Sequence, residues 1–196
     1  NNPTGTPLDI AVIEAVYEAS RGMVIVDEAY WEFAPKDQRS AITLLEGRPR
    51  LLVSRTMSKA FAFAGARVGY LAADPAVIDA LRLVRLPYHL SALTQAAALA
   101  ALDHSAEMLG MVDEIVVQRD RISATLTELG YTPLASWSNF VLFGGVADPA
   151  LMWQELYDRG ILIRDVGIPG HLRVTAGTAD ETTAFLEALA SIDSNA

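Results

Sequence analysis

The sequence contains no cysteine, few histidines and no long apolar run. The absence of cysteine excludes disulfide scaffolds, zinc sites with cysteine ligands, iron–sulfur clusters and thiol nucleophiles. The three histidines, His89, His104 and His171, are scattered along the chain, so we expect no metal site. No apolar segment reaches the roughly 18 residues that a membrane helix needs, and no signal peptide is visible. We therefore expect a cytoplasmic protein without a membrane partner.

Basic residues are outnumbered by acidic ones. Lysine and arginine together number 15 against 24 aspartate and glutamate residues, which gives a formal net charge of −9 at pH 7. This balance argues against a nucleic-acid partner, whose phosphates require a basic surface. Of the 196 residues, 52% are hydrophobic and 20% are charged, a composition typical of a globular chain with a substantial core.

Short apolar runs alternate with segments of helical periodicity. The apolar runs that predict strands lie at residues 23–26, 51–53, 68–72, 140–143 and 161–163, and residues 171–175 predict a further strand. The segments that predict helices lie at residues 8–20, from Asp74-Pro75 onward, 91–102, 104–129, 149–159 and 179–191. The alternation indicates an α/β fold, and the first strand is expected to be buried on both faces. We place a domain boundary in the long helix at about 105–130, between residues 1–115 and 116–196.

A lysine follows the apolar run at residues 51–53, at the end where ligands bind in open α/β sheets. This residue, Lys59, could act as a Schiff-base amine. Thr56, Ser58 and Arg67 offer the hydroxyl and guanidinium groups that suit a phosphate. The alternative interpretation is a solvated lysine at the edge of a loop.

A carboxylate stands at the end of the preceding strand. Asp27 comes after a run of apolar residues and is followed by Ala29 and Tyr30 in the pattern Asp-x-Ala-Tyr. A carboxylate there either caps the following turn or is directed into a site. An Asn-Pro-Thr-Gly turn at residues 2–5 precedes this pattern. It is followed by the pair Ser58-Lys59, with Arg67 eight residues beyond the lysine.

The ordered set of motifs resembles the fold-type I pyridoxal-phosphate (PLP) aminotransferases, and among them the histidinol-phosphate aminotransferases. The resemblance covers essentially the whole chain and includes residues 86–91, 138–140, 163–165 and 172–177. It implies the aspartate aminotransferase-like fold of PLP-dependent transferases. Residues 1–115 would be the C-terminal part of the large mixed-sheet PLP-binding domain, and residues 116–196 the small C-terminal α/β domain.

The resemblance implies a role for each candidate residue at the cofactor. Lys59 would bind PLP covalently and, once released, move a proton. Asp27 would pair with the pyridine nitrogen and keep it protonated. Tyr30 and Asn2 would hydrogen-bond the oxygen on the ring. The cofactor phosphate would be held by Thr56, Ser58 and Arg67.

The resemblance also implies substrate-binding residues. Arg173 would clamp the carboxylate of glutamate or 2-oxoglutarate through paired hydrogen bonds. Arg164 would take the phosphate of a phosphate-ester substrate, and Asn139 would line the same pocket. For Arg164 the alternative is a surface ion pair with Asp165, which would contribute little.

The implied reaction converts histidinol phosphate and 2-oxoglutarate to imidazole-acetol phosphate and glutamate, reversibly, in histidine biosynthesis. The first alternative is an aromatic-amino-acid aminotransferase, because glutamate requires an arginine in both cases. A third candidate function on the same scaffold is that of a threonine-phosphate decarboxylase. The alternative from another functional class is a non-catalytic module of this fold. The complete set of candidate residues argues against this alternative.

The resemblance also implies a homodimer of chains roughly twice this length. The present chain starts without methionine, within a turn, and the resemblance places the remaining part of such a protein before Asn1. That part would carry the loop that binds the phosphate and the ring that stacks on PLP. We therefore expect these 196 residues alone to be inactive.

Overall fold

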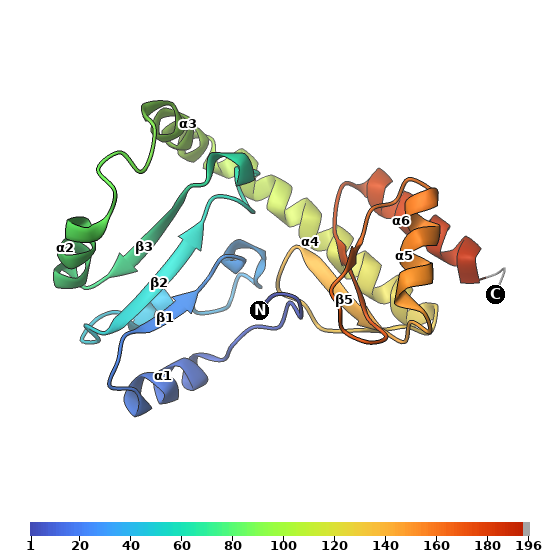
Figure 1. Ribbon diagram of the computed structural model, residues 1–196, viewed down its shortest axis with the longest axis horizontal. Coiled ribbons are helices and arrows are strands. Elements are labelled where there is room, and N and C mark those ends of the chain that lie inside the picture. Colours follow the sequence, from blue (N-terminus) through green and yellow to red (C-terminus); the bar gives the residue numbers. More distant parts are fainter. Residues whose placement is uncertain (194–196) are drawn as a thin grey trace. The chain divides into compact units, whose positions relative to one another are not determined.

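The structure, a computed structural model, describes residues 1–193. These residues form two compact units. One unit is Leu8–Met111, and the other combines Asn1–Pro7 with the chain from Val112 onward. The helix α4 (Ser105–Glu128) continues from one unit into the next (Figure 1). The assignment of residues 1–115 and 116–196 to separate domains stays a prediction.

The unit Leu8–Met111 is built on a three-stranded sheet in the order β1-β2-β3. β1 (Val24–Asp27) runs parallel to β2 (Leu51–Thr56), and β3 (Gly69–Ala73) runs antiparallel to β2. Apolar residues of α1 (Ile10–Ala19) and of the short 3-10 helix η2 (Ala41–Leu44) pack with those of β2 to form the core. The predicted strands at 51–53 and 68–72 are thus confirmed, apart from their ends.

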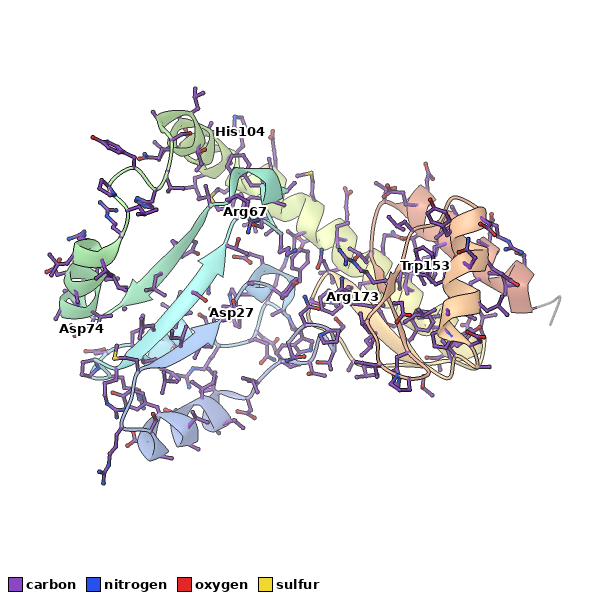
Figure 2. All side chains as sticks on the ribbon, viewed as in Figure 1. Asp27, Arg67, Asp74, His104, Trp153 and Arg173 are labelled. Atoms are coloured by element: carbon purple, nitrogen blue, oxygen red, sulfur yellow. The ribbon has the colours of Figure 1, made fainter. Side chains whose placement is uncertain are left out.

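Helices of this unit begin at residues whose side chains cap them. The side chain of Asp74 accepts a hydrogen bond from an amide in the first turn of α2 (Pro75–Val84), as the sequence predicts (Figure 2). Ser91 caps α3 (Ala92–Asp103) in the same way. Two further 3-10 helices, which the sequence does not predict, are η1 (Trp31–Phe33) and η3 (Ala64–Ala66).

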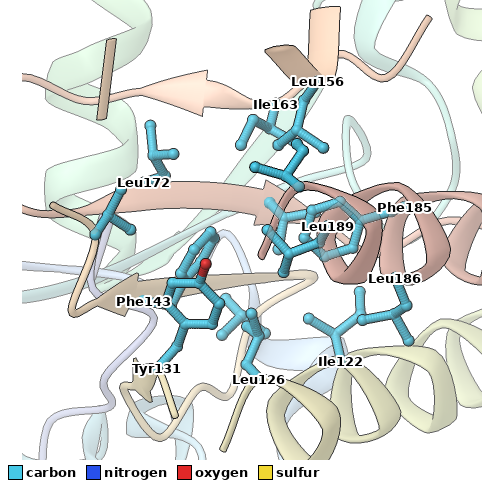
Figure 3. Packing of buried hydrophobic residues seen from close by; sticks show 14 of the residues in the cluster. Ile122, Leu126, Tyr131, Phe143, Leu156, Ile163, Leu172, Phe185, Leu186 and Leu189 are labelled. Carbon is cyan, nitrogen blue, oxygen red and sulfur yellow. The ribbon is translucent and has the colours of Figure 1, made fainter. Parts of the chain in front are cut away.

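The second unit contains a four-stranded antiparallel sheet in the order β4-β5-β7-β6. Its strands are β4 (Thr132–Pro133), β5 (Phe140–Gly144), β6 (Arg164–Asp165) and β7 (Leu172–Thr175). Two helices, α5 (Pro149–Asp158) and α6 (Ala179–Asp193), contribute with α4 to the core shown in Figure 3. In that core the rings of Tyr131 and Phe143 meet edge to face, with their centroids 5.6 Å apart.

Two expectations about strands are wrong. Residues 161–163 are not a strand: β6 starts at Arg164, and the Ile163 carbonyl instead accepts a hydrogen bond from the Trp153 indole at 3.0 Å. β1 is not buried on both faces, since Ile25 is 65% exposed. Among the described residues β1 has a strand partner only in β2, so its other edge is unpaired.

Within residues 1–193, no helix combines the length and the apolar character needed to cross a membrane.

Candidate active site

Asp27 lies at the carboxyl end of β1, directly opposite Ser54 of β2 in the parallel register (Figure 2). Its carboxylate oxygen Oδ1 accepts a hydrogen bond from the Ala29 amide at 3.0 Å and one from the Ser54 hydroxyl at 3.4 Å. The residue is exposed. Asp27 therefore stabilises the turn after β1 as a cap, and its role in a site stays a prediction.

Lys59 follows β2 and lies close to Tyr30, which follows β1. The ammonium nitrogen of Lys59 stands 5.7 Å from the centroid of the Tyr30 ring, within the range of a cation–π contact. Lys59 is exposed and Tyr30 is half-buried. The parallel pairing of β1 with β2 explains this proximity, because it places both loops at the same edge of the sheet.

The two predicted phosphate-binding hydroxyls are also in contact. The Thr56 hydroxyl donates to the Ser58 hydroxyl at 2.8 Å and accepts a hydrogen bond from the Ser58 amide at 3.1 Å. Arg67 has a left-handed backbone conformation (φ 55°), and its guanidinium donates to the Ala64 carbonyl at 2.9 Å. Arg67 is exposed and holds the turn of η3 rather than either hydroxyl.

An ion pair that the sequence does not predict lies beside these groups. The buried carboxylate of Glu28 accepts hydrogen bonds from Nε of Arg55 at 3.0 Å and from its Nη2 at 2.8 Å. Burial would lower the pKa of Arg55, but hydrogen bonds with Glu28 and Tyr70 outweigh it, so the pKa is raised. Side-chain alternation reveals the pair only once the register of β1 against β2 is known, because Glu28 follows Asp27 and Arg55 follows Ser54 on these neighbouring strands.

An open cavity of about 430 Å³ adjoins this ion pair. Its wall includes Arg55, Trp31, Phe61, Tyr70 and Glu32. Oxygen Oε2 of Glu32 is buried and has no hydrogen-bond partner among the described residues. Burial raises the pKa of Glu32 above its ordinary value. The cavity thus combines aromatic walls with one carboxyl group whose pKa is raised by burial.

The other predicted residues lie in the second unit. A guanidinium nitrogen of Arg173, Nη1, donates a hydrogen bond to Oδ1 of Asn2, and the guanidinium stands 4.7 Å from the centroid of the Phe140 ring. Arg164 of β6 is directly opposite Arg173 of β7, so both side chains leave the same face of the sheet. Within the described residues Arg164 makes no ion pair with Asp165, whose carboxylate instead accepts a hydrogen bond from the Gly167 amide at 2.8 Å.

The turn at residues 1–5 is held against this sheet by its backbone. The Gly5 carbonyl accepts a hydrogen bond from the Trp137 amide at 2.9 Å. Gly5 has a positive φ of 75°, and a β-carbon there would overlap the Ser136 hydroxyl oxygen. Only glycine fits this position. Asn139, also predicted, is half-buried, and its backbone carbonyl accepts a hydrogen bond from the Ala176 amide at 2.9 Å.

Comparison with known proteins identifies the family. A family model described as aminotransferase class I and II matches residues 1–189. The chain belongs to this family. Among curated relatives, the histidinol-phosphate aminotransferase of Paenarthrobacter aurescens is 66% identical over 195 residues, which cover 98% of this chain and 52% of the relative. The chain spans about half the length of the curated relatives it matches.

Solved structures of aminotransferases share the fold. The histidinol-phosphate aminotransferase from Sinorhizobium meliloti, in complex with pyridoxal-5'-phosphate, matches with a TM-score of 0.85 at 30% identity over 99% of this chain and 55% of its own. The aspartate aminotransferase of Thermotoga maritima matches with a TM-score of 0.85 at 21% identity over 100% of this chain and 55% of its own. The expected aspartate aminotransferase-like α/β fold is thereby confirmed.

Proposed function

We propose that this chain carries the lysine and the substrate arginines of a PLP-dependent aminotransferase of histidine biosynthesis. The enzyme would convert histidinol phosphate and 2-oxoglutarate to imidazole-acetol phosphate and glutamate, reversibly. The observation that carries the proposal is the approach of the Lys59 amine to the Tyr30 ring, 5.7 Å from its centroid, beside a strand that ends in Asp27. The name of the 66% identical relative supports the choice of substrate.

The chemistry of the groups in the unit Leu8–Met111 fits PLP. An amine suits the aldehyde of the cofactor, and a carboxylate at a strand end suits its protonated pyridine nitrogen. The hydroxyl pair of Thr56 and Ser58, together with the guanidinium of Arg67, suits its phosphate. When bound, PLP supplies an electron sink for the electrons left at the substrate α-carbon. Nζ of Lys59 would hold the cofactor and then carry the α-proton of the substrate.

The paired arginines of the second unit suit substrates with two anionic groups. Like charges opposite each other on neighbouring strands repel, and the side chain of Arg164 has no ion pair or hydrogen bond within residues 1–193. An anionic ligand would relieve that repulsion. Arg173 would bind the substrate carboxylate, oriented by Asn2, and Arg164 would bind the phosphate.

Absorbance spectroscopy tests the proposal. The protein expressed from its complete gene is mixed with PLP, and spectra are recorded before and after the addition of L-glutamate, histidinol phosphate or L-phenylalanine. We expect a visible band that glutamate and histidinol phosphate bleach. Bleaching by phenylalanine in preference to histidinol phosphate would instead indicate the aromatic enzyme. A protein that binds PLP without any bleaching would indicate the non-catalytic module.

We also propose that the enzyme is a cytoplasmic homodimer. Support for a partner comes from apolar side chains at the end of α2 and beyond, since Leu83 is 87% exposed, Tyr88 97% and Leu93 84%. All three lie in one stretch of the chain, from α2 to the start of α3, and exposed apolar segments of this kind often mark places that other protein covers. Sedimentation equilibrium would measure the mass of the assembly, and a monomer at micromolar concentration would contradict the dimer. Cell fractionation with an antibody would test the location.

A further inference from the structure

The ends of β1 and β2 carry different chemistry on their two faces. Successive side chains of a strand point to opposite faces. Asp27 and Ser54 share one face, as their 3.4 Å hydrogen bond shows. Glu28 and Arg55, each one residue later, meet on the opposite face. The Asp27 carboxylate and the ion pair therefore lie back to back across the same two strand ends.

The ion pair ties the two strand ends to each other and to η2. Beyond its two hydrogen bonds from Arg55, the Glu28 carboxylate accepts one from the Ala41 amide at 2.6 Å and one from the Ser40 hydroxyl at 2.8 Å. Nη2 of Arg55 also donates to the Ser40 hydroxyl at 2.9 Å. The Glu28 amide donates to the Ser54 carbonyl at 2.9 Å, which continues the pairing of the strands past Asp27.

Because the Glu28–Arg55 ion pair is buried, a contribution to stability alone does not explain it well. The side chains of Glu28 and Arg55 are 7% and 15% exposed. Desolvation of two charges largely cancels their attraction, and apolar residues of the same volume often stabilise a core as well or better. A pair with several directional hydrogen bonds does, however, fix the separation of the elements that carry it.

We propose that the Glu28–Arg55 ion pair is a positioning element that sets the distance and register between Asp27 and the Thr56–Lys59 segment. The inference rests on the proposed function, because it concerns how these groups meet PLP. Glu28 adjoins Asp27 and Arg55 adjoins Thr56 in the chain. A shift of either strand end would move a group that holds the cofactor, and small displacements in such sites weaken binding and catalysis.

Single substitutions provide the first test, in the protein expressed from its complete gene. Glu28→Gln and Arg55→Met each leave one buried charge unpaired. We expect each to weaken PLP binding about tenfold or more and to reduce the visible circular dichroism per bound PLP. The matched control is Glu14→Gln, which breaks the Glu14–Arg48 ion pair of 2.9 Å in the same unit. This control should leave PLP binding unchanged.

The double variant Glu28→Gln/Arg55→Met separates positioning from stability. It removes both charges, so no unpaired charge remains, and we expect it to unfold at a higher urea concentration than either single variant. PLP binding should nevertheless stay weak and its circular dichroism low, because the cross-link between the strand ends is absent.

Failure of the positioning inference and failure of the proposed function would give different results. If PLP affinity recovers with stability in the double variant, or is unchanged in the single variants, the pair only stabilises the fold and the inference is wrong. If the unsubstituted protein binds no PLP, the proposed function fails and takes this inference with it.

Discussion

Arg173 donates a hydrogen bond to the side chain of Asn2, although 171 positions separate the two residues in the chain. The contact lies within one compact unit, because residues 1–7 belong with the C-terminal sheet. It restrains a guanidinium that would otherwise sample several rotamers. A restrained guanidinium presents its fork to a carboxylate at a lower entropic cost.

Loss of the Asn2 amide should therefore weaken the binding of glutamate. We expect Asn2→Ala to raise the KM for glutamate about tenfold, since hydrogen bonds to charged groups contribute about 1.5–3 kcal/mol. Asn2→Asp should raise it further, because its carboxylate would compete with the substrate for Arg173. Steady-state kinetics measures both. An unchanged KM in Asn2→Ala would show that Arg173 needs no orientation by this residue.

Covalent binding of PLP can be assigned to one residue, because these 196 residues include only two lysines, Lys36 and Lys59. After borohydride reduction of the protein expressed from its complete gene, we expect mass spectrometry to find the cofactor on the peptide that contains Lys59. Lys59→Ala should abolish this label and transamination, whereas Lys36→Ala should retain both. Label on any other lysine, or full activity without Lys59, would refute the assigned role.

Arg164 should distinguish the two substrates. We expect Arg164→Gln to raise the KM for histidinol phosphate roughly tenfold to a hundredfold, since it removes a charged partner of the phosphate, and to change that for glutamate much less. The control is Arg159→Gln, which removes an arginine that contacts Glu155 at the end of α5. Equal effects of Arg164→Gln on both substrates would argue against a phosphate site.

Glu32 should make stability depend on pH. Its pKa is raised by burial, so the folded protein binds the Glu32 proton more tightly than the unfolded chain does. The resulting stabilisation is complete below the ordinary glutamate pKa and is lost as pH rises through the raised pKa. Glu32→Gln should therefore be more stable than the unsubstituted protein at pH 7, by at most about 1 kcal/mol because the side chain is only partly buried. Near pH 4 the two proteins should be about equally stable.

Urea unfolding at the two pH values measures this difference. The exposed Glu46 provides a control, since Glu46→Gln should show no such dependence. A Glu32→Gln protein that is less stable at pH 7 would show that the carboxylate has a partner when ionised.

Features set by neighbouring residues are predictable from the sequence. The cap of α2 depends on Asp74 and Pro75 alone, and the structure confirms it. The start of β6 and the exposure of Ile25 depend instead on distant partners. The Ile163 carbonyl accepts a hydrogen bond from Trp153, and Ile25 lies on a strand that pairs on one side only among the described residues. Apolar composition alone does not distinguish such positions from strand interiors.

The residues of the candidate site also differ in whether the sequence predicts them. Asp27, Lys59 and Tyr30 are found at one sheet edge because motifs mark them and parallel strands align their ends. No sequence motif predicts the pairing of Glu28 with Arg55. Their pairing requires knowledge that β1 and β2 are neighbours and in which register, information that is contained in the sheet rather than in either segment.

The contact between Gly5 and Trp137 has a consequence for the order of folding. Ribosomes make a chain from its N-terminus, so residues 1–5 are synthesised long before Ser136 and Trp137 exist. The unit Leu8–Met111 has all its residues by then, whereas the second unit needs both early and late segments. Contacts between segments far apart in the chain form slowly. Completion of the second unit is therefore a late event, after a period in which the turn at residues 1–5 has no partner in that sheet.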